Sequence, residues 1–157
     1  MNSRRHLVAS VLAAIGVLFL VTSATAQNSV HGVHRLPGSW HVVIQNVDLG
    51  SLPALFTFTS DGTMIGTESP GPFESPAFGS WAPRGGGVAF TVFALLGSPA
   101  GMGTNTGKLK VVGSLHYDRG SDSWSGDFSL FFIPPVAGAN PIPAGIGHLT
   151  LTRIEVE

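Results

Sequence analysis

Residues 107–133 read GKLKVVGSLHYDRGSDSWSGDFSLFFI, and their residue pattern indicates the fold class. Apolar and polar side chains alternate along it on both sides of a short turn at residues 119–122. Alternation with a period of two is typical of a strand with one buried face, and two such runs joined by a short turn predict an antiparallel hairpin. The face expected to point inward carries Leu109, Val111, Gly113, Leu115 and Tyr117, then Trp124, Gly126, Phe128, Leu130 and Phe132.

The same period recurs from Gly38 onward, and no stretch sustains the 3.6-residue apolar period of a helix. We predict eight strands, at residues 38–46, 54–60, 63–68, 77–83, 88–96, 107–118, 123–133 and 146–156. Eight antiparallel strands can close a small barrel whose interior is filled by side chains or holds one small ligand. The predicted fold class is therefore all-β, with an eight-stranded antiparallel up-and-down barrel over residues 38–157.

The predicted connections alternate in length. Short turns are expected at residues 61–62, 84–87 and 119–122, and longer connections at residues 47–53, 69–76, 97–105 and 134–145. Successive connections of an up-and-down barrel lie at opposite ends, so the longer ones should share one rim. Because binding residues are often carried by loops on a rigid scaffold, a binding site is expected at that rim.

Residues 1–26 have the pattern of a signal peptide. Arg4 and Arg5 precede an apolar run at residues 7–21, and Ala24 and Ala26 form an A-x-A cleavage pattern. The apolar run is about 15 residues long, shorter than the roughly 20 that a membrane-spanning helix needs. We therefore expect a secreted or periplasmic protein, with residues 27–37 as a flexible N-terminal arm and no membrane contact after cleavage.

The composition limits the available chemistry. The chain has no cysteine, which excludes disulfides, thiol nucleophiles and thiolate metal ligands. Removal of Arg4 and Arg5 leaves an excess of acidic side chains, so no nucleic-acid partner is expected. Glu74 and Asp48 are the acids best placed near the long-loop rim for acid–base catalysis, with solvated loop carboxylates as the alternative. No catalytic residue, metal site or cofactor is predicted.

The expected interior is apolar and aromatic. It would be a packed core or a pocket for a hydrophobic molecule, and Gly113 and Gly126 favour the pocket because they remove side-chain volume. The candidate ligand-binding residues, inside the barrel and at its rim, are Ile44, Phe56, Phe73, Phe90, Met102, Phe128 and Phe132.

Trp40 and Arg153 are expected to meet at the closed end of the barrel, where the first strand begins and the last one ends. An inward guanidinium needs a partner, and the face of an indole ring supplies one. The Gly38-Ser39-Trp40 motif and the single Arg in the last strand resemble the signature of the calycin superfamily, which includes lipocalins, fatty-acid-binding proteins and avidins.

This resemblance covers residues 38–156 and implies an up-and-down barrel that binds small apolar molecules. It also implies that Trp40 and Arg153 are structural residues at the closed base. The chain departs from the lipocalin pattern because it has no disulfide, no recognisable helix before the last strand and no T-D-Y motif.

The leading functional hypothesis is a secreted or periplasmic protein that binds a small hydrophobic molecule at the long-loop end of the barrel. One alternative is a cofactor-free cyclase or isomerase that acts on an apolar substrate. Another is an extracellular interaction or inhibitor module with a filled barrel. Apolar side chains expected on the outer wall, such as Val43, Phe93 and Val112, also suggest a homo-oligomer.

Overall fold

The computed structural model describes residues 32–48, 50–68, 74–98 and 101–155. The predicted signal peptide at residues 1–26 and the first part of the predicted arm lie outside these residues. No helix in the described part of the chain has the length and apolar character needed to cross a membrane.

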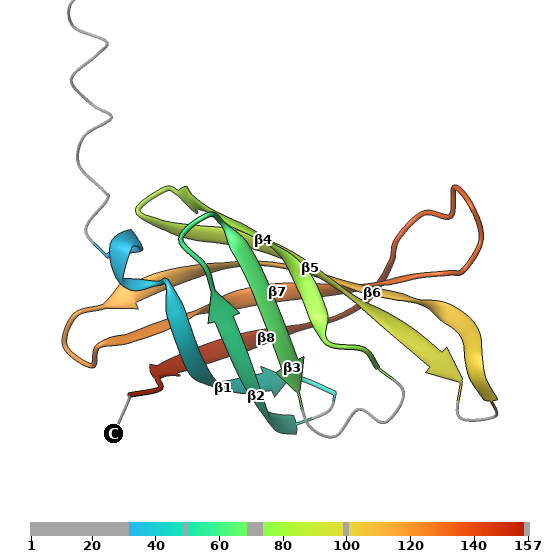
Figure 1. The fold of residues 1–157 in the computed structure, drawn as a ribbon, viewed down its shortest axis with the longest axis horizontal. Helices are drawn as coiled ribbons and strands as arrows, with labels where there is room; N and C mark the ends of the chain where they lie inside the picture. The colour runs from blue at the N-terminus through green and yellow to red at the C-terminus, as the bar shows by residue number, and fades with distance from the viewer. Residues whose placement is uncertain (1–31, 49, 69–73, 99–100, 156–157) are drawn as a thin grey trace, which may run out of the picture.

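Eight antiparallel strands form a closed barrel in sequence order (Figure 1). Each strand pairs with the next one along the chain, and β8 pairs with β1 to close the barrel. The predicted fold class is confirmed. The strands are β1 (Gly38–Asn46), β2 (Gly50–Phe58), β3 (Thr63–Glu68), β4 (Ala77–Arg84), β5 (Gly87–Ser98), β6 (Gly101–Asp118), β7 (Ser123–Ile133) and β8 (Ile142–Arg153).

Burial alternates along the strands as the sequence pattern predicts. In β1, Trp40, Val42 and Ile44 are buried, whereas the residues between them are exposed. The hairpin predicted at residues 107–133 is formed by β6 and β7, whose last pair before the turn is Asp118 with Ser123. Period-two patterning therefore identified the interior face, because it follows directly from the alternating geometry of a strand.

The strict alternation of long and short connections is wrong. β2 begins at Gly50, β5 ends only at Ser98, and β6 begins at Gly101. Two of the expected long connections are therefore reduced to residues 47–49 and 99–100. The segments at residues 50–53, 97–98 and 101–105 were predicted as loops because their side chains do not alternate. They nevertheless form backbone hydrogen bonds with neighbouring strands, which requires no apolar side-chain pattern. The connections at residues 69–76 and 134–141 remain long.

A short 3-10 helix, η1 (Val33–Arg35), lies at the end of the barrel where β1 begins (Figure 1). Leu36, which follows it, is fully buried, and its carbonyl oxygen accepts a 2.8 Å hydrogen bond from Trp40 Nε1. Over its described part, the flexible arm expected at residues 27–37 is thus replaced by a segment packed onto the barrel. The physical reason is that Val33 and Leu36 are apolar residues three positions apart, which one turn of helix brings to the same side.

Arg153 and Trp40 meet at this end, which we call the base. The Arg153 guanidinium carbon lies 4.3 Å from the centroid of the Trp40 ring. The guanidinium also donates hydrogen bonds to the carbonyl oxygens of Arg35 and, at 3.4 Å, Pro37. These contacts supply the partners that an inward-facing charge requires.

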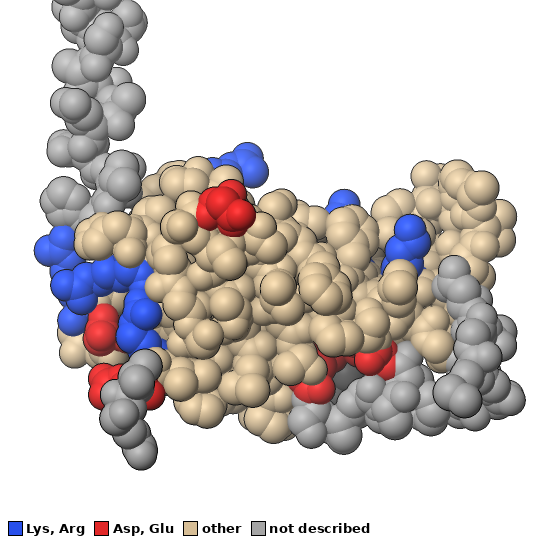
Figure 2. Space-filling view, in the orientation of Figure 1, with Lys and Arg blue, Asp and Glu red and all other residues tan. Residues whose placement is uncertain are grey.

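Charged side chains gather over the base, while most of the visible wall is uncharged (Figure 2). Arg35 pairs with Asp122 at 3.3 Å and donates a 2.9 Å hydrogen bond to the Tyr117 hydroxyl. On the outer wall, Val43, Phe93 and Val112 are exposed. Self-association through this wall stays a prediction.

Candidate functional site

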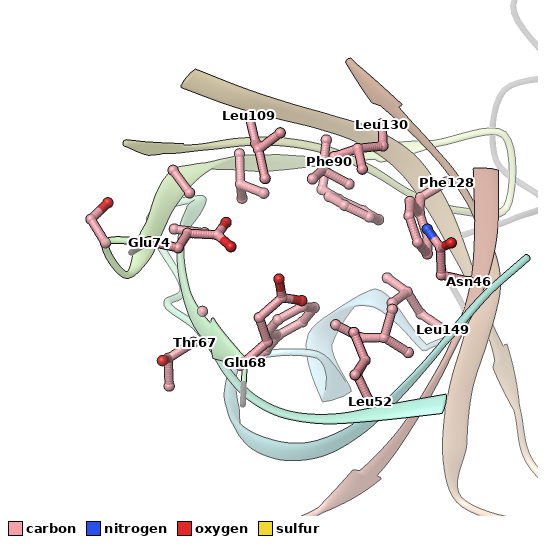
Figure 3. Close-up of a pocket in the computed structure, with 18 residues that line it drawn as sticks. Asn46, Leu52, Thr67, Glu68, Glu74, Phe90, Leu109, Phe128, Leu130 and Leu149 are labelled. Atoms are coloured by element: carbon pink, nitrogen blue, oxygen red, sulfur yellow. The ribbon is translucent and has the colours of Figure 1, made fainter. Parts of the chain in front are cut away.

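A cavity of about 210 Å³ occupies the end of the barrel opposite the base (Figure 3). All eight strands contribute to its wall, which is mainly apolar; its aliphatic residues include Ile44, Leu52, Val92, Leu109, Leu130 and Leu149. An engineered apolar cavity of roughly 150 Å³ is enough to bind benzene. The barrel can therefore hold a small organic molecule. The cavity is inconsistent with the filled barrel that the hypothesis of an interaction or inhibitor module requires.

Three phenylalanine rings lie against the cavity wall, and each is paired across the strands with a glycine. The pairs are Phe56 with Gly66, Phe90 with Gly113, and Phe128 with Gly147. A Cβ atom built on any of these glycines would lie 2.5–2.6 Å from an atom of the paired ring, closer than van der Waals contact allows. The rings thus occupy the space above the glycines and leave the centre of the barrel empty.

This arrangement changes the role expected for Gly113 and Gly126. The space above Gly113 is filled by the Phe90 ring, and a Cβ on Gly126 would collide with the backbone carbonyl of Ser114. Glycine enlarges the cavity indirectly, because it allows a large side chain to lie flat on the sheet.

The structure places four of the predicted ligand-binding residues around the cavity: Ile44, Phe56, Phe90 and Phe128. Phe132 does not line it; a Cβ built on Gly107 would meet the Phe132 ring at 2.6 Å, so this ring packs over Gly107. Phe73 and the side chain of Met102 lie outside the described residues.

Two carboxyl groups form the polar side of the cavity. Glu68 is the last residue of β3, and Glu74 is held by an isolated bridge to Leu96 of β5. The next residue, Ser75, fixes this segment: its backbone N–H donates to the Leu95 carbonyl and its hydroxyl accepts from the Leu95 N–H, both at 2.9 Å. Figure 3 shows both carboxyl groups directed into the cavity.

The surroundings of Glu74 favour its protonated form. Burial, the negative charge of Glu68 and a hydrogen bond with the Glu68 carboxyl raise the pKa of Glu74 to about 7. Near neutral pH, Glu74 can therefore keep a proton, on a carboxyl group that is hydrogen-bonded to Glu68.

Sequence reasoning identified Glu74 as a rim acid but missed Glu68. A signal was present, because Glu68 has the same strand parity as the inward-facing Met64 and Gly66. Asp48, the other candidate acid, does not line the cavity; its backbone N–H donates a 2.8 Å hydrogen bond to Asn46 Oδ1. In the described ranges, no group of three or more potential metal ligands occurs.

No protein-family model matches the chain, and no curated protein matches it. Among solved structures, the chain is similar to EF1p2_mFAP2b, determined bound to DFHBI, with 22% sequence identity and a TM-score of 0.50 over 78% of this chain and 97% of that one. It is also similar to a redesigned β-barrel, b11L5F_LGL, with 22% identity and a TM-score of 0.44 over 82% of this chain and 100% of that one. The first similarity is one of fold.

Proposed function

We propose that this protein is a secreted or periplasmic binding protein that holds one small, mainly apolar molecule in the cavity. The observation that carries the proposal is the apolar cavity of about 210 Å³, which remains open beside a fully packed base. Small-molecule sites in proteins are concave, mostly apolar and largely preformed, with a few polar groups that orient the ligand. This cavity has each of these properties.

Two further observations support the proposal. The calycin-like combination of Trp40 and Arg153 implies a barrel that binds small apolar molecules, and a barrel of similar fold was solved bound to DFHBI. The expectation of secretion rests on residues 1–26 alone.

The test is to fill the cavity. Ala94 is buried and lines the cavity, so Ala94→Phe should occupy it; Ala82→Phe adds the same ring on the exposed outer face of β4 and is the matched control. Native mass spectrometry of protein purified from its own host should detect a small-molecule adduct on the wild type and on Ala82→Phe, and none on Ala94→Phe. An adduct retained by folded Ala94→Phe, or absent from all three proteins, would contradict the proposal.

A second candidate function is the cofactor-free isomerase or cyclase. It is favoured by the convergence of Glu68 and Glu74 inside the cavity, since one protonated and one ionised carboxyl can act as general acid and general base. Conversion of the co-purifying molecule by the wild type, abolished in Glu74→Gln, would favour this candidate. Release of the same molecule unchanged would favour simple binding.

A further inference from the structure

We propose that the molecule held in the cavity is an apolar compound that carries one positively charged amine, which pairs with Glu68 and Glu74. This inference rests on the proposed binding function and specifies the chemical class of the ligand.

The first argument is the charge of the lining. Of the described residues that line the cavity, Glu68 and Glu74 are the two with titratable side chains. The neighbouring lysines of β6 point away: Lys108 is exposed, and Lys110 Nζ lies 6.0 Å from the centroid of Phe93 on the outer wall. The described part of the cavity lining therefore supplies no basic group to balance the carboxyl pair, and an anionic ligand such as a fatty acid would meet like charge.

The second argument is the distribution of polar groups. In Figure 3, the two carboxyl groups lie on one side of the cavity, and the wall facing them carries Phe128 and Leu149 together with the polar Asn46. The cavity thus has an acidic side and a mainly apolar body. An amine attached to an apolar group matches both, because an ammonium group forms strong charge-assisted hydrogen bonds with carboxylates.

The third argument concerns protons. Glu74 pairs through its backbone with Leu96 of β5 and its carboxyl group hydrogen-bonds with that of Glu68 of β3; these two acids are the titratable groups among the described residues that line the cavity. A bound cation stabilises the ionised form of the pair. Binding of an amine should therefore strengthen as the pH rises through about 7, the pKa of Glu74, whereas binding of a neutral analogue should not.

The experiment uses three probes with the same apolar body and different charges: 1-naphthylmethylamine, 1-naphthylmethanol and 1-naphthoic acid. Isothermal titration of the mature protein at pH 8 and low salt should give an affinity for the amine about 10-fold or more above that for the alcohol, with the acid weakest. The preference for the amine should shrink at pH 5.5.

Three isosteric variants complete the test. Glu74→Gln and Glu68→Gln should each reduce the preference for the amine, whereas Asp48→Asn, an acid outside the cavity lining, should leave it unchanged. If the alcohol binds as tightly as the amine, or the acid binds best, the amine inference fails while the binding function stands. If none of the three probes binds the wild type, both are overturned.

Discussion

The base and the cavity end of this barrel use aromatic side chains differently. At the base, Phe58 pairs across the strands with Met64 and Trp124 pairs with Leu151, and all four are almost completely buried. Each of the three rings that line the cavity instead pairs with a glycine on one neighbouring strand. Where both partners have side chains, the interior fills; where one partner is glycine, the ring lies along the wall and a hollow remains.

The cavity is therefore a consequence of strand register. Phe58 and Phe56 are two residues apart on the same face of β2, and their rings are in contact, with centroids 6.4 Å apart and an interplanar angle of 70°. One belongs to the packed base and the other to the cavity wall because β3 presents Met64 to the first and Gly66 to the second.

The largest expected effect compares two buried phenylalanines, Phe58 and Phe90, which are 1% and 3% exposed. Phe58→Ala at the base should lower the free energy of unfolding by about 3–5 kcal/mol, because it removes a ring packed on all sides. Phe90→Ala should cost about half as much, because one face of Phe90 borders the cavity and makes fewer contacts. Urea denaturation of both variants measures the difference. Equal losses would show that the two regions are packed alike.

The second prediction concerns the glycine beneath a ring. Gly66→Ala would place a Cβ 2.6 Å from Phe56 Cδ1, so the ring must turn toward the cavity. We expect a stability loss of about 1–3 kcal/mol and a loss of about 10-fold or more in affinity for 1-naphthylmethanol, measured by isothermal titration.

The double variant Gly66→Ala/Phe56→Leu is the control, since the smaller leucine no longer needs the space above residue 66. It should recover most of the affinity for the alcohol. Unchanged affinity in Gly66→Ala would show that the glycine does not maintain the cavity.

The smallest expected effect is the pH dependence of stability at the cavity end. The pKa of Glu74 is higher in the folded protein, at about 7, than its ordinary value of 4.5. The folded state therefore binds the proton more tightly, and the contribution of Glu74 to stability is greatest below about pH 4.5 and is lost as the pH rises to about 7. Urea denaturation between pH 4.5 and 8 measures this slope.

In Glu74→Gln, the part of the slope that comes from residue 74 should vanish. Asp48→Asn removes a rim carboxyl outside the cavity lining and should keep the slope. An identical pH profile for wild type and Glu74→Gln would contradict the assignment of the raised pKa to burial beside Glu68.

The parts of the site predicted from the sequence are those that depend on strand parity. Ile44, Phe56, Phe90 and Phe128 were assigned to the interior because each continues an alternating run, and the structure places them around the cavity. Phe132 follows the same parity, but its ring packs over Gly107 near the end of the strand pair. Glu68 was missed because it is a charged residue at a strand end, although its parity with Met64 points inward.

The class of the fold and the inward face of most strands follow from the amino-acid sequence alone, because both depend on the two-residue period of an extended chain. Tertiary structure alone decided that η1 packs at the base, that backbone pairing extends through Gly-rich segments such as Gly97 with Asn105, and that Glu68 lies beside Glu74. It also decided that the barrel is hollow. A hollow depends on which glycine faces which ring, and the register that brings them together is set only when neighbouring strands pair.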